Sequence, residues 1–75
     1  MKSFTYRILL NKEPEGGYTV NVPSLPGCIT FGKTVDEAIE HAKEAISLYI
    51  ESLVTHHEPV PDDHDTLEYS LTLSA

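Results

Sequence analysis

The sequence predicts an α+β domain in the order β-β-β-α-β, with one long helix packed on a small mixed sheet. Three observations lead to this class: two apolar–polar alternations near the N-terminus, one long helical period with a start signal, and another alternation near residue 70. A length of 75 residues predicts a single domain over 1–75. A chain of this size has a marginal core, so self-association is an expected source of stability.

The first two strands are predicted as a hairpin. Residues 3–10 alternate, with Phe4 and the three even-numbered residues after it on one side. Residues 18–22 alternate again, beginning at Tyr18. Gly16 and Gly17 stand between the two runs and are read as turn residues, because a tight hairpin turn needs positive φ angles.

A rigid corner is predicted after the hairpin. Pro23 cannot donate a ladder hydrogen bond, so the second strand should end there. Pro26 and Gly27 mark a turn. Residues 28–31 then form a short third strand with its two large apolar side chains on one face, and Gly32 breaks it.

The helix has the clearest local signal in the chain. Thr34 can accept a hydrogen bond from the backbone N–H of Glu37, and Glu37 can reach back to Thr34 as in a capping box. Apolar residues then recur at offsets of three and four from Val35 to Val54, which predicts a helix from 35 to about 55.

The last strand is predicted over residues 67–73. Leu67, Tyr69, Leu71 and Leu73 alternate with polar residues. Because this strand follows a helix, it is expected to return by a right-handed crossover and pair parallel with an earlier strand. The opposite sheet face would stay open, and a dimer would be one way to cover it.

Composition restricts the partners. Twelve acids against five bases give a formal charge of −7, which disfavours direct binding of nucleic acid and suits a basic partner. On charge alone, however, a role in keeping the small protein soluble is the first explanation. The single Cys28 rules out a disulfide within the chain and favours a reducing, cytosolic setting. Because there is neither a leader nor an apolar run of membrane-spanning length, no membrane association is expected.

No catalytic residue, cofactor or metal site is predicted. The predicted strands 3–10, 18–22 and 28–31 carry no acid that could hold the metal ions of a nuclease. Cys28 has apolar neighbours, which favours a buried thiol over a nucleophile paired with a histidine. The remaining candidates for a metal or a base have no ligand spacing of a known kind, and they are His41, His56, His57, His64, Asp62, Asp63 and Asp65.

These parts, in this order, resemble the HicB-like antitoxin family. The resemblance covers residues 4–61 and, more loosely, the last strand, and it rests most on the segment Pro23–Cys28 at its distance from the capping box. We treat as the structural signature the residues Gly16, Gly17, Tyr18, Pro23, Pro26, Gly27, Cys28, Thr34 and Glu37.

The resemblance implies a partial ribonuclease-H-like fold without nuclease activity. It also implies a cytoplasmic protein that binds and inhibits a small basic, HicA-like, mRNA-cleaving toxin, and that forms a homodimer or higher oligomer. Many members of the family carry a C-terminal DNA-binding segment, which we do not expect in residues 1–75. The alternative is a solitary relative that contacts a ligand or RNA and has no toxin partner.

Overall fold

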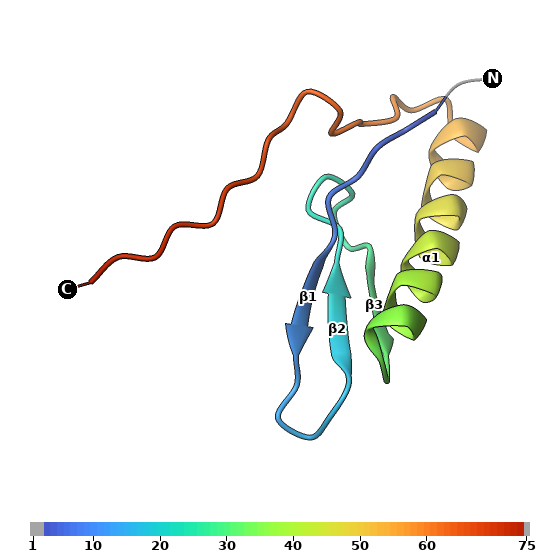
Figure 1. Ribbon diagram of the computed structural model, residues 1–75. Coiled ribbons are helices and arrows are strands. Elements are labelled where there is room, and N and C mark those ends of the chain that lie inside the picture. Colours follow the sequence, from blue (N-terminus) through green and yellow to red (C-terminus); the bar gives the residue numbers. More distant parts are fainter. Residues whose placement is uncertain (1–2, 75) are drawn as a thin grey trace.

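A three-stranded antiparallel sheet lies against one long helix in a computed structural model of the protein, which describes residues 3–74 (Figure 1). The strands are β1 (Leu9–Lys12), β2 (Tyr18–Asn21) and β3 (Ile29–Gly32), and the helix is α1 (Val35–Thr55). The predicted α+β class is therefore confirmed, with the first three strands and the helix in the predicted order.

Two antiparallel pairings define the sheet, whose order is β1-β2-β3. Leu10 lies opposite Val20, and Val20 lies opposite Thr30. Because side chains alternate between the two faces of a strand, this register places Leu10 and Val20 on one face. Both belong to the core shared with α1, whereas Ile29 and Phe31 on the other face are exposed. The hairpin and the shared face of Ile29 and Phe31 are confirmed.

The helix packs on the sheet through small residues. Ala38 and Ala42 are fully buried, and they contact Val20 at the centre of β2. Small side chains bring the helix axis close to the strands, which is necessary where Gly32 of β3 faces the backbone of Ala38. The polar side of α1 is exposed, so the helix covers one face of the sheet as its period predicts.

The helix start follows the predicted cap in one half only. The side chain of Thr34 accepts a hydrogen bond from Glu37 N at 3.1 Å, as expected. The carboxylate of Glu37, however, accepts from Lys33 N at 3.0 Å and not from Thr34 N. The second bond of the predicted capping box is therefore shifted by one residue, while the two backbone donors at the helix start still find side-chain partners.

Thr34→Ala should lower the free energy of unfolding by about 1 kcal/mol, because Glu37 N would lose its acceptor at the start of α1. Urea denaturation followed by circular dichroism measures the change. Ser47→Ala is the matched control, since Ser47 is exposed on the same helix and the structure gives it no cap. Equal stability of Thr34→Ala and the unmodified protein would contradict this role of the threonine.

Two predicted boundaries at the ends of the chain need correction. Residues 3–8 are extended but do not pair as a strand, so β1 begins at Leu9 rather than at residue 3. Residues 67–73 form no strand and no parallel pairing, and the sheet within residues 3–74 is antiparallel rather than mixed. The segment runs extended away from the sheet and helix (Figure 1). An apolar–polar alternation shows that a segment is able to form a strand, but it does not determine which strand it pairs with.

Candidate functional site

The signature segment after β2 is a closed loop that inserts one leucine into the core. Val22 N donates to Cys28 O at 3.1 Å, and Cys28 N donates to Leu25 O at 2.9 Å, so the loop closes on itself. Leu25 is fully buried, and Val22 and Cys28 are buried with it against the second half of α1. The hydroxyl of Tyr49 on α1 donates to the carbonyl of Pro26 at 2.7 Å. The loop is thus held to the helix by packing and by one hydrogen bond.

The glycines of the signature have the conformations that the sequence predicts. Gly16 and Gly17 have φ angles of +106° and +83°, and Gly27 has +82°. Cys28 is buried, and desolvation raises the pKa of its thiol. A buried thiol with a raised pKa is a poor nucleophile, so the structural role predicted for Cys28 agrees with its position.

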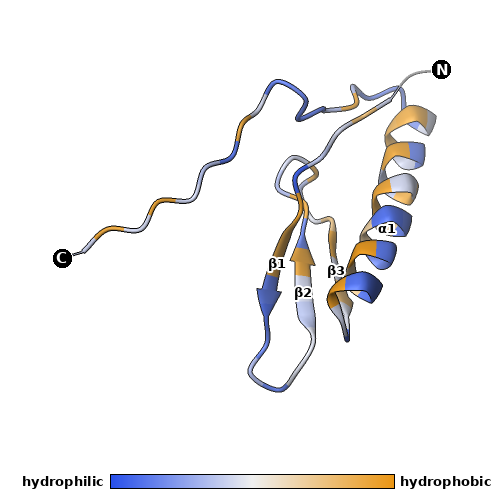
Figure 2. Ribbon diagram, in the orientation of Figure 1, coloured by the Kyte–Doolittle hydropathy of each residue, from blue (hydrophilic) through white to orange (hydrophobic). Residues whose placement is uncertain are grey.

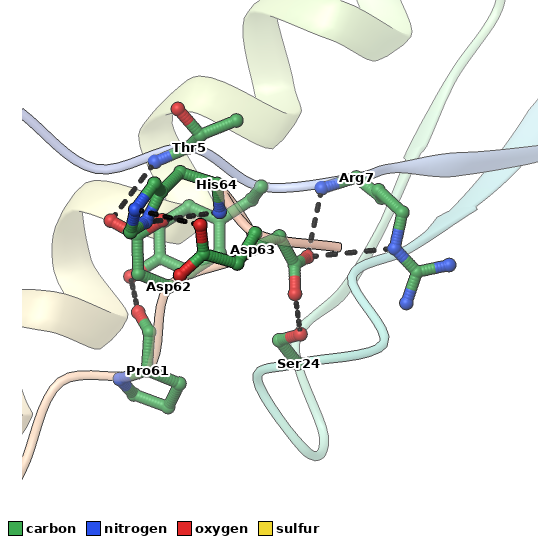
Figure 3. Close-up of polar contacts among 9 residues, drawn as sticks. Thr5, Arg7, Ser24, Pro61, Asp62, Asp63 and His64 are labelled. Atoms are coloured by element: carbon green, nitrogen blue, oxygen red, sulfur yellow. Dashed lines mark hydrogen bonds and ion pairs between the residues drawn. The ribbon is translucent and has the colours of Figure 1, made fainter. Parts of the chain in front are cut away.

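Asp63 joins three distant parts of the chain (Figure 3). Its carboxylate accepts from Arg7 N at 3.0 Å and, at a short distance, from the hydroxyl of Ser24 in the signature loop. Its own N–H donates to Thr5 O at 2.8 Å. Asp63 is the buried polar residue of the described chain. It connects the segment after α1 to the segment before β1 and to the loop.

The bonds to Asp63 favour its charged form. The hydroxyl of Ser24 and the backbone N–H of Arg7 lower the pKa of this carboxyl below its usual value near 3.8. The Arg7 guanidinium adds to this, with Nε at 3.8 Å from the carboxylate. The phenol of Tyr6, in contrast, has a raised pKa. Burial is the largest cause, and the negative charges of Asp62 and Asp63 add to it. Tyr6 stays protonated and donates to Pro61 O at 2.5 Å.

We expect the protein to lose stability in acid, because the stabilising contribution of Asp63 depends on its charge. Its pKa is lower in the folded chain than in the unfolded chain, so its contribution is complete above the unfolded value. That contribution is lost as the pH falls through the folded pKa. We expect Asp63→Asn to flatten the dependence of the unfolding free energy on pH below about pH 4.

Denaturant unfolding at a series of pH values tests this expectation. Asp65→Asn removes the same charge two residues away, where the side chain is 90% exposed, and serves as the matched control. Equal slopes for Asp63→Asn and the unmodified protein would contradict the assignment.

A groove of about 530 Å³ lies between the segment before β1 and α1. Phe4, Tyr6 and Ile8 line one side, and the helix supplies mainly apolar residues on the other, including Ile39, Ile46 and Ile50. Because side chains of an extended segment alternate, residues 4, 6 and 8 share one face, as the sequence predicts. The groove is mostly apolar and is open to the surface.

The exposed side of α1 is acidic. Asp36, Glu40, Glu44 and Glu51 are all exposed, and their spacings of four and seven residues place them on one side of the helix. Lys43 lies beside them and pairs with Glu40 at 3.3 Å. This surface would attract a basic macromolecule.

His41, His56 and His64, which could have belonged to a catalytic or metal site, lie at three different places in the structure. His41, in the first half of α1, has its Nδ1 2.5 Å from the carbonyl oxygen of Phe31 in β3. His56 contacts Ser52 O at 2.7 Å as part of the helix end. His64 pairs with Asp62 and Asp65 at 3.3 and 3.2 Å. Within residues 3–74, no three His, Cys, Asp or Glu side chains come together in a way that could hold a metal ion.

Several structurally important residues escaped prediction. Asp63 stands in a polar run that reads as solvated, and its partners Arg7 and Ser24 lie 56 and 39 residues away. Contacts at that separation leave no local pattern. Gly32 reads as the end of a strand, although its close approach to Ala38 is what requires a glycine. The partner-binding residues were not predicted, and the groove and the acidic helix side now supply candidates.

Comparison with known proteins identifies related chains. Residues 6–72 match the sequence model of the family described as HicB-like antitoxin of bacterial toxin-antitoxin system. A UPF0150 protein of Thermoplasma acidophilum is 52% identical over 59 residues, which are 79% of this chain and 86% of that protein. A UPF0150 protein of Synechocystis is 50% identical over 60 residues, 80% of this chain and 76% of that protein.

A relative with a functional name is more distant. The antitoxin HicB of Escherichia coli K12 is 38% identical over 56 residues, and the match covers 75% of this chain and 41% of that protein.

No helix in the described part of the chain is long and apolar enough to cross a membrane.

Proposed function

Because this chain belongs to the HicB-like antitoxin family, we propose that it is an antitoxin that neutralises a small basic HicA-like toxin by direct contact. The match over residues 6–72 carries this proposal. In this role the protein is a cytoplasmic binding module of one domain, not an enzyme. The mRNA-cleaving chemistry belongs to the toxin, and the antitoxin blocks access to it.

The charge of the molecule supports such a role. The net charge is −7, and four exposed acids lie along one side of α1. A ribonuclease must attract the phosphate backbone of RNA, which requires a basic surface. An acidic helix side can occupy that surface, compete with RNA, and speed the encounter between the two proteins.

A cleavage assay tests the proposal. The purified chain is mixed with a cognate HicA-like toxin, and cleavage of an mRNA substrate is followed as the chain is titrated. We expect cleavage to stop near equal amounts of the two proteins. Full cleavage at excess chain would overturn the proposal, and binding of free RNA by the chain alone would favour the solitary, RNA-contacting alternative.

A charge-reversal pair tests the contact surface. Glu40→Lys with Glu44→Lys should weaken inhibition strongly and make the remainder less sensitive to salt, because both side chains are exposed on the acidic side of α1. Glu15→Lys with Glu58→Lys changes the charge equally at exposed loop positions. An equal loss from both pairs would mean that overall charge, not this helix side, provides the attraction.

Two further parts of the proposal concern assembly and ancestry. We expect the antitoxin to act as a homodimer or a higher oligomer, which fits a chain of 75 residues with a small core. The partial ribonuclease-H-like relationship would make the protein a non-catalytic member of that architecture. Light scattering of the purified chain measures the first part directly.

A further inference from the structure

The C-terminal segment 66–74 has the pattern of a strand, but it pairs with no strand among residues 3–74. Leu67, Tyr69, Leu71 and Leu73 are 95%, 84%, 76% and 86% exposed. They alternate with polar residues in the sequence, and Figure 2 shows separate hydrophobic bands along the extended segment. Within residues 67–74, the polar contact that the structure gives is Glu68 to Arg7 at 3.7 Å. Four large apolar side chains in one row are rarely left in water on a monomer.

The base of the segment is fixed, so its direction is set. Asp63 is bonded to Thr5, Arg7 and Ser24, and Thr66 N donates to Asp63 O at 2.8 Å in a turn. The chain then leaves the body of the protein on the side of β1 (Figure 1). Residues 62–63 already occupy the positions beside residues 5–7 of the same copy. The residues that follow run away from the sheet and helix of their own copy (Figure 1).

A complementary surface is present on every copy. β1 is an edge of the sheet, so one side of its backbone has no strand beside it. The apolar groove lies between α1 and residues 4–8, which lead directly into β1. A strand that ran beside both β1 and residues 4–8 would place every second side chain on the helix side, where this groove lies. The segment has its apolar residues at every second position.

The charges of the two surfaces also match. Residues 65–74 contain the acids Asp65 and Glu68 and no lysine or arginine. Residues 7–12 contain Arg7 and Lys12 and no acid, although the chain as a whole has 12 acids and five bases. The β1 edge of a second copy is therefore less acidic than the chain as a whole, although its Arg7 already contacts Asp63 and Glu68 of its own copy.

We propose that residues 66–74 of one copy add as a strand to the β1 edge of a second copy, with their apolar side chains in that copy's groove. The exchange is reciprocal, because each copy supplies one strand and one edge, and a two-fold axis closes the assembly. In this dimer, the exposed segment 66–74 of each copy covers the open β1 edge of the other. The inference deepens the self-association proposed above and does not depend on the identity of the toxin.

The first test measures assembly of the full chain without toxin. Light scattering after gel filtration should give twice the mass of one chain. Leu71→Lys should raise the dissociation constant about tenfold or more, because it removes a large apolar side chain from the interface. Thr72→Lys adds the same charge at the next residue, on the other side of the strand, and should have a much smaller effect. A single-chain mass, or equal effects of the two variants, would overturn the proposal.

The second test distinguishes exchange from closure within one copy. Equal amounts of ¹³C-labelled and unlabelled chain are mixed, and isotope-filtered NOE spectra select contacts between copies. We expect contacts from Leu71 and Leu73 to Ile8 and Ile46 of the other copy. The same contacts within one copy, or a dimer that lacks them, would overturn the proposal. Protection of residues 66–74 that appears only after toxin is added would also overturn the proposal. Failure of the chain to inhibit the toxin would count against the proposed function but not against the strand exchange.

Discussion

Gly32→Ala is expected to lower the free energy of unfolding by about 3 kcal/mol, at the upper end of the usual cost of overcrowding a packed core. A Cβ at this position would lie 2.3 Å from the backbone nitrogen of Ala38 and 2.4 Å from its Cα. Both atoms belong to the helix backbone, so no side chain can rotate away to make room. The start of α1 would have to move off β3, which would loosen the contact between Ala38 and Val20.

Chemical denaturation at fixed protein concentration measures this loss. Gly27→Ala is the matched control, because a Cβ there would meet no heavy atom within 4 Å. Its φ of +82° is unfavourable for alanine and should cost about 1–2 kcal/mol. A larger loss from Gly27→Ala than from Gly32→Ala would mean that backbone conformation, not the close approach of helix and strand, decides the stability of this region.

Leu25→Ala should cost about 3 kcal/mol, within the range for truncating a fully buried leucine. Leu25 has no exposed surface and fills the space between the signature loop and the second half of α1. Its removal would leave a cavity beside Val22 and Cys28, and the hydrogen-bonded loop could close over it only in part.

The same denaturation experiment measures this change. Leu48→Ala is the control on the neighbouring helix, where the side chain is 63% exposed, and it should change stability by less than about 0.5 kcal/mol. A small loss from Leu25→Ala, similar to that from Leu48→Ala, would show that the loop does not depend on this residue for its attachment.

The elements that could be predicted are those specified by nearby residues. Thr34 and the apolar period after it define α1, because a cap and a helical face involve residues only three or four positions apart. Gly16 and Gly17 define the hairpin for a similar reason, since a turn is a local structure. These predictions needed no knowledge of tertiary contacts.

The predictions that failed depend on distant contacts. The strand expected at 67–73 has the right alternation, but pairing requires an edge to which it can bind, and the anchor at Asp63 directs it away from the edge of its own copy. The anchor itself joins residues from three separate segments. The groove was equally out of reach, because it forms only when residues 4–8 and α1 lie side by side.

The burial of Cys28 has a practical consequence for studying this protein. The sequence contains one cysteine, and its thiol is covered by the loop and has a raised pKa. Thiol reagents act on the accessible thiolate, so Cys28 in the native chain should react very slowly with maleimides at neutral pH. A cysteine introduced at any exposed position can therefore carry a fluorophore or a spin label without first removing the natural one.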